Sequence, residues 1–503
     1  MIAVKKINEV YVRLVCSDSL AEDVSQYFTF FAHNYKFSPL FKKRVWDGKI
    51  RLFNKKKFQL YIGLLDYLAS FCKERDIKLI VDDELKHDNG FKIADAQEFA
   101  EELNLYSYGK KITPYEDQIR AVAHAIRNER SVLISPTASG KSLIIYIISR
   151  YLLASECKTG LLVVPTISLV EQMYNDFKDY SSKNGWNVDI ECKKVYAGQD
   201  KTMKKALTIS TWQSIYDQPE DYFKQFDFII GDEAHTFKAQ SLAKIMTNLT
   251  NAKYRIGTTG TIDDVKVHKL TLEAYFGPAQ RITTTKELID KNRLSQFEIK
   301  CLILKYPTEI CTQVKGYDYQ KEIDFIVTNP IRNNYVANLA LSLEGNTLIL
   351  FQFVEKHGRI LHSIVESKAK DGRKVFFIAG ETDVEVRDSV RHITEKENNA
   401  IIVASYGTFS TGVSIRNLHN IIFASPSKSK IRNLQSIGRG LRLGENKEKA
   451  FLYDIVDDLR YNNEELNFAM KHYVERMKIY HEEKFKISTY KIGLDYVKKE
   501  TQS

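Results

Sequence analysis

One segment, residues 135–142 with the sequence SPTASGKS, constrains the fold of this chain more than any other. It lies between apolar runs at 132–134 and 143–145, an order typical of a strand, a tight loop and a helix. The free backbone N–H groups and the dipole of a helix N-terminus bind a dense anion such as a triphosphate. The segment therefore predicts a phosphate-binding loop.

The loop residues suit ATP and its metal ion. Gly140 allows close approach of the backbone, Lys141 is expected to reach the β- and γ-phosphates, and the Ser142 hydroxyl is expected to hold Mg²⁺. Ser135 replaces the first glycine of the usual G-x-x-x-x-G-K-[ST] pattern, so a chance loop-to-helix turn is the alternative. The expected ATP-binding residues of the loop are Pro136, Thr137, Ala138, Ser139, Gly140, Lys141 and Ser142.

Acidic residues follow a second apolar strand pattern at 226–231. A carboxylate at the end of a strand beside a phosphate loop is where a nucleoside triphosphatase holds its metal. We expect Asp232 to bind Mg²⁺ and Glu233 to polarise the attacking water. His235 is expected to sense the γ-phosphate and to link hydrolysis to DNA binding. An acidic helix N-cap is the alternative interpretation.

With this phosphate loop and acidic segment, the chain resembles a superfamily 2 helicase of the DEAH-box-like kind. Further segments match the helicase motifs in order: 114–118 (adenine element), 164–172 (Ia), 210–214 (Ic), 257–261 (III), 405–414 (V) and 435–442 (VI). Gly260 stands where alanine is more usual in motif III. The resemblance implies a base-edge contact from Gln118, stacking by Tyr115, and further ATP contacts from Gly412 and Gln435.

The resemblance also implies arginines that act on the phosphates from a second domain. Motif VI fits Q-x-x-G-R-x-x-R, with Arg442 as the arginine finger and Arg439 beside the γ-phosphate. Such an arginine typically increases the rate of phosphoryl transfer by about 10³–10⁵-fold. A surface salt-bridge role for either arginine is the alternative.

Backbone contacts with the nucleic acid are expected from motifs Ia, Ic and V. The candidates are Thr166, Ser210, Thr211, Trp212 and Thr411, with weaker candidates at Phe353, Lys356, Gly380 and Arg387. Residues of these motifs also serve sheet packing, which is the alternative for each. Because backbone contacts carry no sequence information, we expect recognition of branched shape rather than sequence.

Segments 37–52, 136–144 and 402–407 narrow the resemblance to the bacteriophage UvsW helicases. That family remodels Holliday junctions, forks, D-loops and R-loops in recombination, repair and replication. The resemblance, not the composition, therefore implies DNA rather than RNA. An RNA helicase, a restriction-type DNA translocase and a non-catalytic duplex-binding scaffold remain alternatives.

Positive charge concentrates near the N-terminus. The chain has a net charge of +10, and residues 1–60 hold twelve Lys/Arg against five Asp/Glu. Such an excess suits salt-dependent binding to a polyanion, although a solvated basic face is the alternative. We expect a hairpin turn at 46–49, with Trp46 packed in the core rather than wedged between bases. The expected duplex contacts are Lys42, Lys43, Arg44, Lys49 and Arg51.

The order of predicted elements gives an α/β fold of two RecA-like parallel sheets with a small N-terminal α+β accessory domain. The expected domains are 1–95 (accessory), 113–285 (first RecA-like), 290–460 (second RecA-like) and 461–503 (a helix and a mixed tail). Within the accessory domain we expect a strand at 10–15 and a helix at 19–31. Expected strands of the sheets are 132–134, 161–164, 207–209, 228–230 and 254–256, then 347–351, 374–378, 400–403, 421–423 and 450–453.

Targeting and metal signals are weak. The six cysteines form no C-x-x-C pair, so reduced structural thiols are expected. Lys5, Lys6 and Glu9 interrupt any signal-peptide core, and the apolar segment 143–154 contains Arg150 and is too short to span a bilayer. We expect a monomer in the cytoplasm, that of the host cell if phage-encoded, with no membrane partner.

Overall fold

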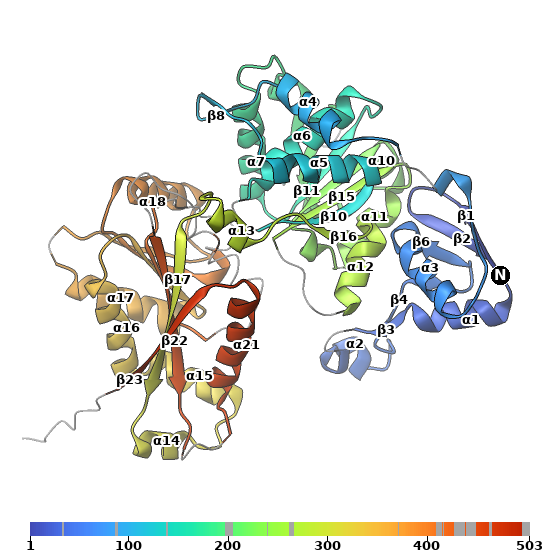
Figure 1. The fold of residues 1–503 in the computed structure, drawn as a ribbon. Helices are drawn as coiled ribbons and strands as arrows, with labels where there is room; N and C mark the ends of the chain where they lie inside the picture. The colour runs from blue at the N-terminus through green and yellow to red at the C-terminus, as the bar shows by residue number, and fades with distance from the viewer. Residues whose placement is uncertain are drawn as a thin grey trace, which may run out of the picture. The chain divides into compact units, whose positions relative to one another are not determined.

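The computed structural model describes residues 1–32, 35–85, 89–136, 139–196, 205–238, 240–260, 266–370, 372–408, 415, 417–426, 438, 449–461 and 465–494. The chain divides into two compact units, Met1–Thr283 and Thr284–Ser503 (Figure 1). The first unit contains the expected accessory domain and nearly all of the expected first RecA-like domain. The exact domain boundaries stay a prediction.

The N-terminal domain, defined here as residues 1–85, is built on a five-stranded sheet. Its strands are β1 (Ile2–Lys6), β2 (Tyr11–Val15), β5 (Phe53–Asn54), β6 (Gln59–Tyr61) and β7 (Leu79–Val81), in the order β5-β6-β2-β1-β7. Only the β1–β7 pair is parallel. Helices α1 (Asp18–Tyr27) and α3 (Leu65–Glu74) contribute Val24 and Phe71 to the core with Val12 of β2.

Two local predictions for this domain are wrong. The helix expected at 19–31 ends at Tyr27, because β3 (Thr29–Phe31) pairs antiparallel with β4 (Lys49–Arg51). No hairpin is centred on 46–49, since the β3–β4 connection holds η1 (Tyr35–Phe37) and α2 (Pro39–Lys42). Gly48 does adopt a turn conformation, with φ of +78°. A long-range strand pair has therefore overridden the local helical and hairpin signals.

A seven-stranded parallel sheet forms the rest of the first unit. Its strands are β10 (Arg130–Ile134), β11 (Gly160–Val164), β12 (Cys192–Val195), β13 (Leu207–Thr211), β14 (Phe228–Asp232), β15 (Tyr254–Thr259) and β16 (Ala279–Arg281), in the order β12-β13-β11-β14-β15-β10-β16. Every strand expected here is present, and the short edge strands β12 and β16 are additional.

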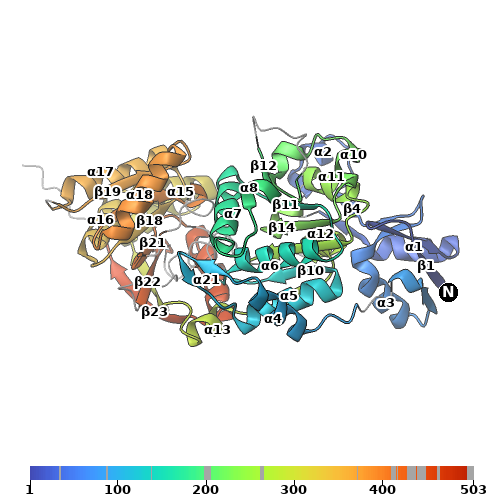
Figure 2. The same cartoon turned by 90° about the horizontal axis from the view of Figure 1, so that it is seen from above.

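Helices cover both faces of this sheet, as Figure 2 shows from above. On one face pack α4 (Ile93–Glu102), α5 (Glu116–Asn128), α6 (Lys141–Ala154) and α7 (Ile167–Tyr180). On the other pack α11 (Gln240–Asn248) and α12 (Lys266–Phe276). Short segments complete the unit: β8 (Tyr106–Ser107), β9 (Lys110–Lys111), α8 (Val188–Glu191), α9 (Trp212–Ile215) and α10 (Glu220–Lys224).

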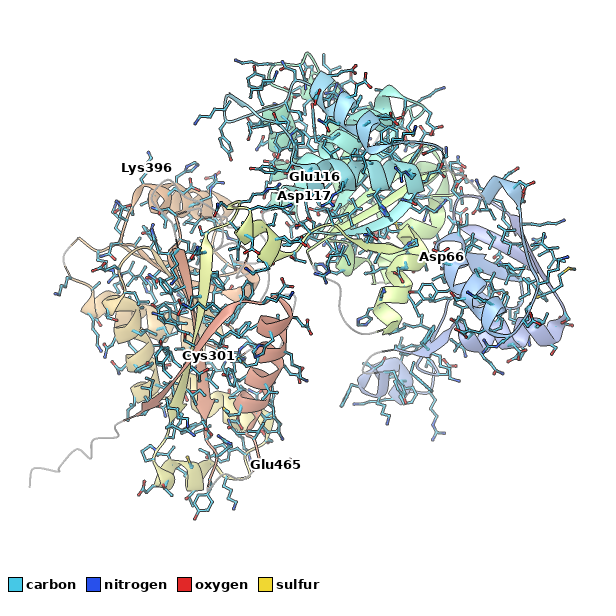
Figure 3. The ribbon with its side chains drawn as sticks, viewed as in Figure 1. Asp66, Glu116, Asp117, Cys301, Lys396 and Glu465 are labelled. Atoms are coloured by element: carbon cyan, nitrogen blue, oxygen red, sulfur yellow. The ribbon has the colours of Figure 1, made fainter. Side chains whose placement is uncertain are left out.

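The second unit repeats this architecture. Its parallel strands are β17 (Gln296–Lys305), β18 (Thr347–Phe351), β19 (Val375–Ile378), β20 (Ile401–Ser405), β21 (Asn420–Phe423), β22 (Lys449–Asp458) and β23 (Lys486–Gly493), in the order β19-β20-β18-β21-β22-β17-β23. Figure 3 labels Cys301 within β17. Its helices are α13 (Thr285–Asp290), α14 (Thr308–Val314), α15 (Tyr319–Thr328), α16 (Pro330–Ser342), α17 (Arg359–Lys368), α18 (Val384–Lys396) and α21 (Phe468–Glu482). The predicted fold class, two RecA-like domains plus a small N-terminal α+β domain, is confirmed.

The chain after residue 460 differs from a helix with a mixed tail. The helix is present as α21, but the tail contributes β23, which pairs with β17 from Glu298↔Lys486 to Lys305↔Gly493. No helix among the described residues is long and apolar enough to cross a membrane, and no cluster of metal-ligating side chains is found among them. All six cysteines are free thiols.

A buried ion pair fastens β22 to α16 in the second unit. Arg332 and Asp457 are both fully buried, and the Arg332 guanidinium donates to the two carboxylate oxygens at 2.7 and 3.0 Å. The Tyr306 hydroxyl donates to the same carboxylate at 2.7 Å. Because a lone charge in such a place is very costly, each partner depends on the other.

Replacing Asp457 with asparagine is expected to destabilise the protein by about 3–5 kcal/mol, since Arg332 then lacks its buried counter-charge. Urea denaturation monitored by circular dichroism measures the change. The control is Asp221→Asn, which removes an exposed ion pair with Lys224 and should cost at most about 1 kcal/mol. Equal losses of stability in the two variants would contradict the prediction.

Candidate nucleotide and nucleic-acid site

Strand register brings three predicted motifs to one edge of the first parallel sheet. Ile134 at the end of β10 pairs with Thr259 of β15, and Thr258 pairs with Asp232 at the end of β14. The Ser135 N–H donates to the Thr259 carbonyl at 2.9 Å. The phosphate loop, the acidic residues and motif III therefore start from neighbouring strands at their C-terminal ends, where open α/β sheets bind ligands.

Gln118 joins the adenine element to the phosphate loop. Its amide Nε2 donates to the Ser139 carbonyl at 2.9 Å, and its Oε1 accepts from the Tyr115 N–H at 2.9 Å. Gly140 has φ of +85°, and a Cβ there would lie 2.3 Å from Gln118 Nε2. Each bond uses one of the two N–H groups or one of the two lone pairs of the amide, so Gln118 keeps a donor and an acceptor for the adenine edge. The Tyr115 side chain is half exposed at the start of α5, next to Glu116 and Asp117, which Figure 3 labels.

The loop is closed upon its own backbone. Lys141 Nζ donates to the carbonyls of Ser135 and Pro136 at 3.1 and 3.2 Å. Ser135, which stands at the position of the usual first glycine, donates its hydroxyl to Ser139 Oγ at 2.6 Å. The Ser142 hydroxyl shares a 2.9 Å hydrogen bond with Tyr180 of α7. Thr137 and Ala138 lie outside the described residues.

Asp232 is the most constrained carboxylate of the site. Its Oδ1 accepts hydrogen bonds from Thr258 Oγ1 at 2.7 Å and from the Glu233 N–H at 2.9 Å. Burial raises the pKa of Asp232, nearby Glu233 raises that pKa further, and Lys141 acts in the opposite direction. Its Oδ2 accepts no hydrogen bond from the residues that the structure describes, so one hard oxygen ligand remains for a cation.

Glu233 and His235 connect the acidic segment to motif III. Glu233 adopts a left-handed backbone conformation, with φ of +50°. His235 Nδ1 lies 3.3 Å from Glu233 Oε2 and 3.1 Å from Thr259 Oγ1. Movement of Thr259 at the end of β15 would therefore change the contacts of both His235 and Glu233.

The candidate DNA contacts of the first unit occupy two kinds of position. Thr166 caps α7 by accepting the Leu169 N–H at 3.3 Å, and Trp212 is half buried. Ser210 and Thr211 are buried, and the Ser210 hydroxyl donates to the Val195 carbonyl at 2.8 Å. Their placement favours the packing alternative for Ser210, while Thr166 and Trp212 remain accessible.

Residues 29–32 and 35–51, which we call the basic arm, lie apart from the five-stranded N-terminal sheet in Figure 1. Lys42, Lys43 and Arg44 are exposed, whereas Arg51 is paired with Asp47. The hydrogen bonds from Arg51 and from the Lys49 N–H lower the pKa of Asp47 to about 2. Trp46 is half buried and donates to the Lys49 carbonyl at 3.0 Å.

Exposed apolar side chains of the basic arm escaped the sequence-based predictions. Phe37 and Val45 are 75% and 73% exposed, and Phe31 and Leu40 are at least half exposed. The signal was present, since in the sequence FSPLFKKRV apolar residues flank a run of three basic residues without a regular period. Thr258 and Tyr180, the partners of Asp232 and Ser142, were also missed as contributors to the site.

Several predicted residues of the second unit cannot be placed. Thr411, Gly412, Gln435, Arg439 and Arg442 lie outside the described residues. Of the weaker candidates, Lys356 pairs with Asp324 and lies 4.3 Å from the centre of the Phe353 ring. Arg387 donates to the Gly380 carbonyl at 2.8 Å.

Comparison with known proteins gives two family matches. Residues 2–82 match the family described as DNA helicase UvsW, N-terminal, and residues 111–264 match Type III restriction enzyme, res subunit. The chain is 33% identical to the ATP-dependent DNA helicase uvsW of Enterobacteria phage T4, over 94% of this chain and 96% of the relative. It is 25% identical to a DNA 3'-5' translocase, XPB2, of Sulfurisphaera tokodaii, covering 69% of this chain and 82% of that protein.

Among solved structures, the crystal structure of T4 UvsW is similar, with a TM-score of 0.52 and 31% identity over 98% of this chain and 100% of that chain. The resemblance thus extends over all parts of the fold, including the N-terminal domain.

Thr258 provides a pH-dependent test of the site. The Thr258 hydrogen bond lowers the pKa of Asp232, so Thr258→Val should raise the pKa of Asp232. If ionised Asp232 is required, the acid limb of the pH profile of ATP hydrolysis moves to higher pH. Thr394→Val, which removes a buried hydroxyl from α18, should leave the profile unchanged. An unshifted acid limb in Thr258→Val would count against the role of Asp232.

Proposed function

The chain belongs to the family of bacteriophage UvsW DNA helicases and is an ATP-dependent DNA helicase, and we propose that it remodels branched DNA. The proposal covers Holliday junctions, forks, D-loops and R-loops as substrates in recombination, repair and replication. The observation that supports it best is the alignment of residues 2–82 with a helicase-specific N-terminal family, joined to a complete first ATPase sheet.

We assign the chemistry of ATP hydrolysis to the edge formed by β10, β14 and β15. Lys141 is within reach of a phosphate oxygen once it releases the Ser135 and Pro136 carbonyls. Glu233 orients the attacking water. His235 connects Glu233 to motif III, because its Nδ1 lies 3.3 Å from Glu233 Oε2 and 3.1 Å from Thr259 Oγ1. Arg439 and Arg442 are proposed to stabilise charge on the transferred phosphoryl group.

Mg²⁺ fits the residues of this edge. Asp232 offers Oδ2, which accepts no hydrogen bond within the described part of the chain, and Ser142 offers a hydroxyl once its bond with Tyr180 is exchanged. When bound, the ion would neutralise negative charge on the phosphates. Thr258 and the Glu233 N–H hold the Asp232 carboxylate in place, so the protein presents that oxygen without reorganisation.

We assign recognition of the branch to the basic arm. Its exposed cations suit phosphates, and its exposed Phe31, Phe37, Leu40 and Val45 offer apolar surface that water solvates poorly. Bases that are unpaired at a branch point can stack on such side chains, whereas bases inside a continuous duplex cannot. The arm therefore combines affinity for any DNA with a preference for open junctions.

Substitution of Lys141 by alanine should lower DNA-stimulated ATP hydrolysis by about 10²-fold or more, because the lysine no longer stabilises phosphate charge in the transition state. A phosphate-release assay measures the rate, and fluorescence anisotropy measures DNA affinity, which should stay within about twofold. A variant that retains wild-type hydrolysis would reject the assigned site. Lys158→Ala, an exposed lysine outside the site, is the control.

Charge reversal of Lys42 and Lys43 tests the basic arm. Loss of these two phosphate contacts should reduce the slope of log affinity against log salt by about 2, and affinity for a four-way junction should fall more than affinity for single strands. The matched control is Lys73→Glu with Lys78→Glu, at exposed positions elsewhere in the N-terminal domain.

The comparison uses single-stranded, duplex, four-way-junction and R-loop substrates at two salt concentrations. An equal decrease of affinity in both double variants would assign binding to net charge alone and would refute a specific role for the arm. Strong stimulation of the wild-type ATPase by RNA and none by DNA would favour an RNA helicase instead.

A further inference from the structure

Helix α12 rests directly on the N-terminal domain. Gly63 of η2 (Ile62–Leu64) lies so close that a Cβ there would be 2.0 Å from the Glu273 carbonyl and 3.0 Å from the Ala274 carbonyl. Leu270 and Ala274 belong to the hydrophobic core of the N-terminal domain. Only glycine at position 63 permits this approach, so the helix backbone and the domain form one packed interface.

The side chain of Glu273 adds a directed contact to the interface. This carboxylate is 3% exposed and accepts the Tyr67 hydroxyl at 2.6 Å. It also accepts the Ala279 N–H of β16 at 3.0 Å, while Lys269 lies 3.8 Å away. Tyr67 follows Asp66, which Figure 3 labels at the start of α3. One buried carboxylate therefore ties the N-terminal domain to both α12 and the parallel sheet.

Further interactions fasten the same two parts together. Arg130 pairs with Glu9 at 2.7 Å, and both side chains are largely buried. The Glu9 N–H donates to the Thr250 carbonyl at 3.0 Å, and the rings of Tyr61 and Tyr275 pack edge to face at 5.5 Å. The N-terminal domain is thus docked through apolar, ionic and hydrogen-bonded contacts, in contrast to a domain on a free linker.

The last residue of α12, in the same turn as Glu273, reaches the strands that carry the ATPase residues. Phe276 is fully buried. A Cβ added to Gly231 would lie 2.8 Å from its ring, and a Cβ added to Gly257 would lie 3.2 Å from it. Gly231 directly precedes Asp232 in β14, and Gly257 directly precedes Thr258 in β15. The ring therefore packs against the backbone beneath the two residues whose hydrogen bond fixes the candidate metal ligand.

We propose that α12 couples the N-terminal domain to the ATPase site, with Glu273 and Phe276 as positioning residues. When the N-terminal domain moves on binding branched DNA, the interface at Gly63 moves α12, and Phe276 shifts the ends of β14 and β15. The geometry of Asp232 and Thr258 changes with them. A close-packed interior transmits such a displacement because it has no free volume to absorb it. This inference rests on the proposed function, since it needs branched DNA at the N-terminal domain.

The test uses Tyr67→Phe in the full-length chain, which removes one hydroxyl from the docking contact and none from the ATPase site. ATP hydrolysis without DNA and with single-stranded DNA should stay within about twofold of wild type. The additional stimulation by a four-way junction over single strands should fall at least threefold. Gly63→Ala, which forces the helix away, should produce the same selective loss of stimulation.

The change in hydrogen–deuterium exchange on junction binding distinguishes coupling from a general loss of stability. In the wild type, junction binding should change exchange in peptides covering 228–232 and 254–259, and in Tyr67→Phe this response should disappear. The matched control is Tyr27→Phe, a tyrosine of the same domain whose ring packs on Phe71.

The outcomes separate the two proposals. Wild-type protein without any junction preference would refute the proposed function, and the coupling would fall with it. A junction preference that persists in Tyr67→Phe and Gly63→Ala, with the exchange response intact, would refute the coupling alone. An equal loss of stimulation in Tyr27→Phe would also refute it, because the effect would then be a general one on the domain.

Discussion

The site depends on a buried negative charge that must be held without a permanent positive partner. Asp232 lies at the end of a strand that is buried along its whole length, and the free energy cost of its ionisation is reduced by Thr258, the Glu233 N–H and nearby Lys141. The two glycines that precede Asp232 and Thr258 leave room for the Phe276 ring beneath these residues. A cation bound with a nucleotide would complete the compensation.

The N-terminal domain connects the environment of Asp232 to the proposed DNA-binding surface. It carries the concentrated positive charge and the exposed apolar groups, yet it is docked on the element that supports β14 and β15. In the proposed function, this docking lets branch recognition communicate with hydrolysis inside the first unit. The second unit repeats the parallel sheet, with buried pairs such as Arg332–Asp457, and its sequence contains the segments 405–414 and 435–442 that we predict as motifs V and VI.

Local pattern was sufficient for the fold class and for the motifs at the strand ends. Runs such as 160–164 and 228–231 are apolar throughout, as strands buried on both faces must be. The edge strand β23 was missed because its sequence KISTYKIG is mostly polar and exposed, and β3 was read as helix because its partner β4 is distant in sequence. Contacts such as Tyr67–Glu273, 206 residues apart, exist only once the chain has folded.

The central claim is that one nucleotide is bound and hydrolysed at the edge formed by β10, β14 and β15. The most direct measurement is the anomalous scattering of Mn²⁺ in crystals grown with a non-hydrolysable ATP analogue. The account predicts a single peak in contact with the Asp232 carboxylate or one of its bound waters, with the triphosphate along residues 136–142. A peak and triphosphate elsewhere, with Asp232 still bonded only to Thr258 and Glu233, would contradict it.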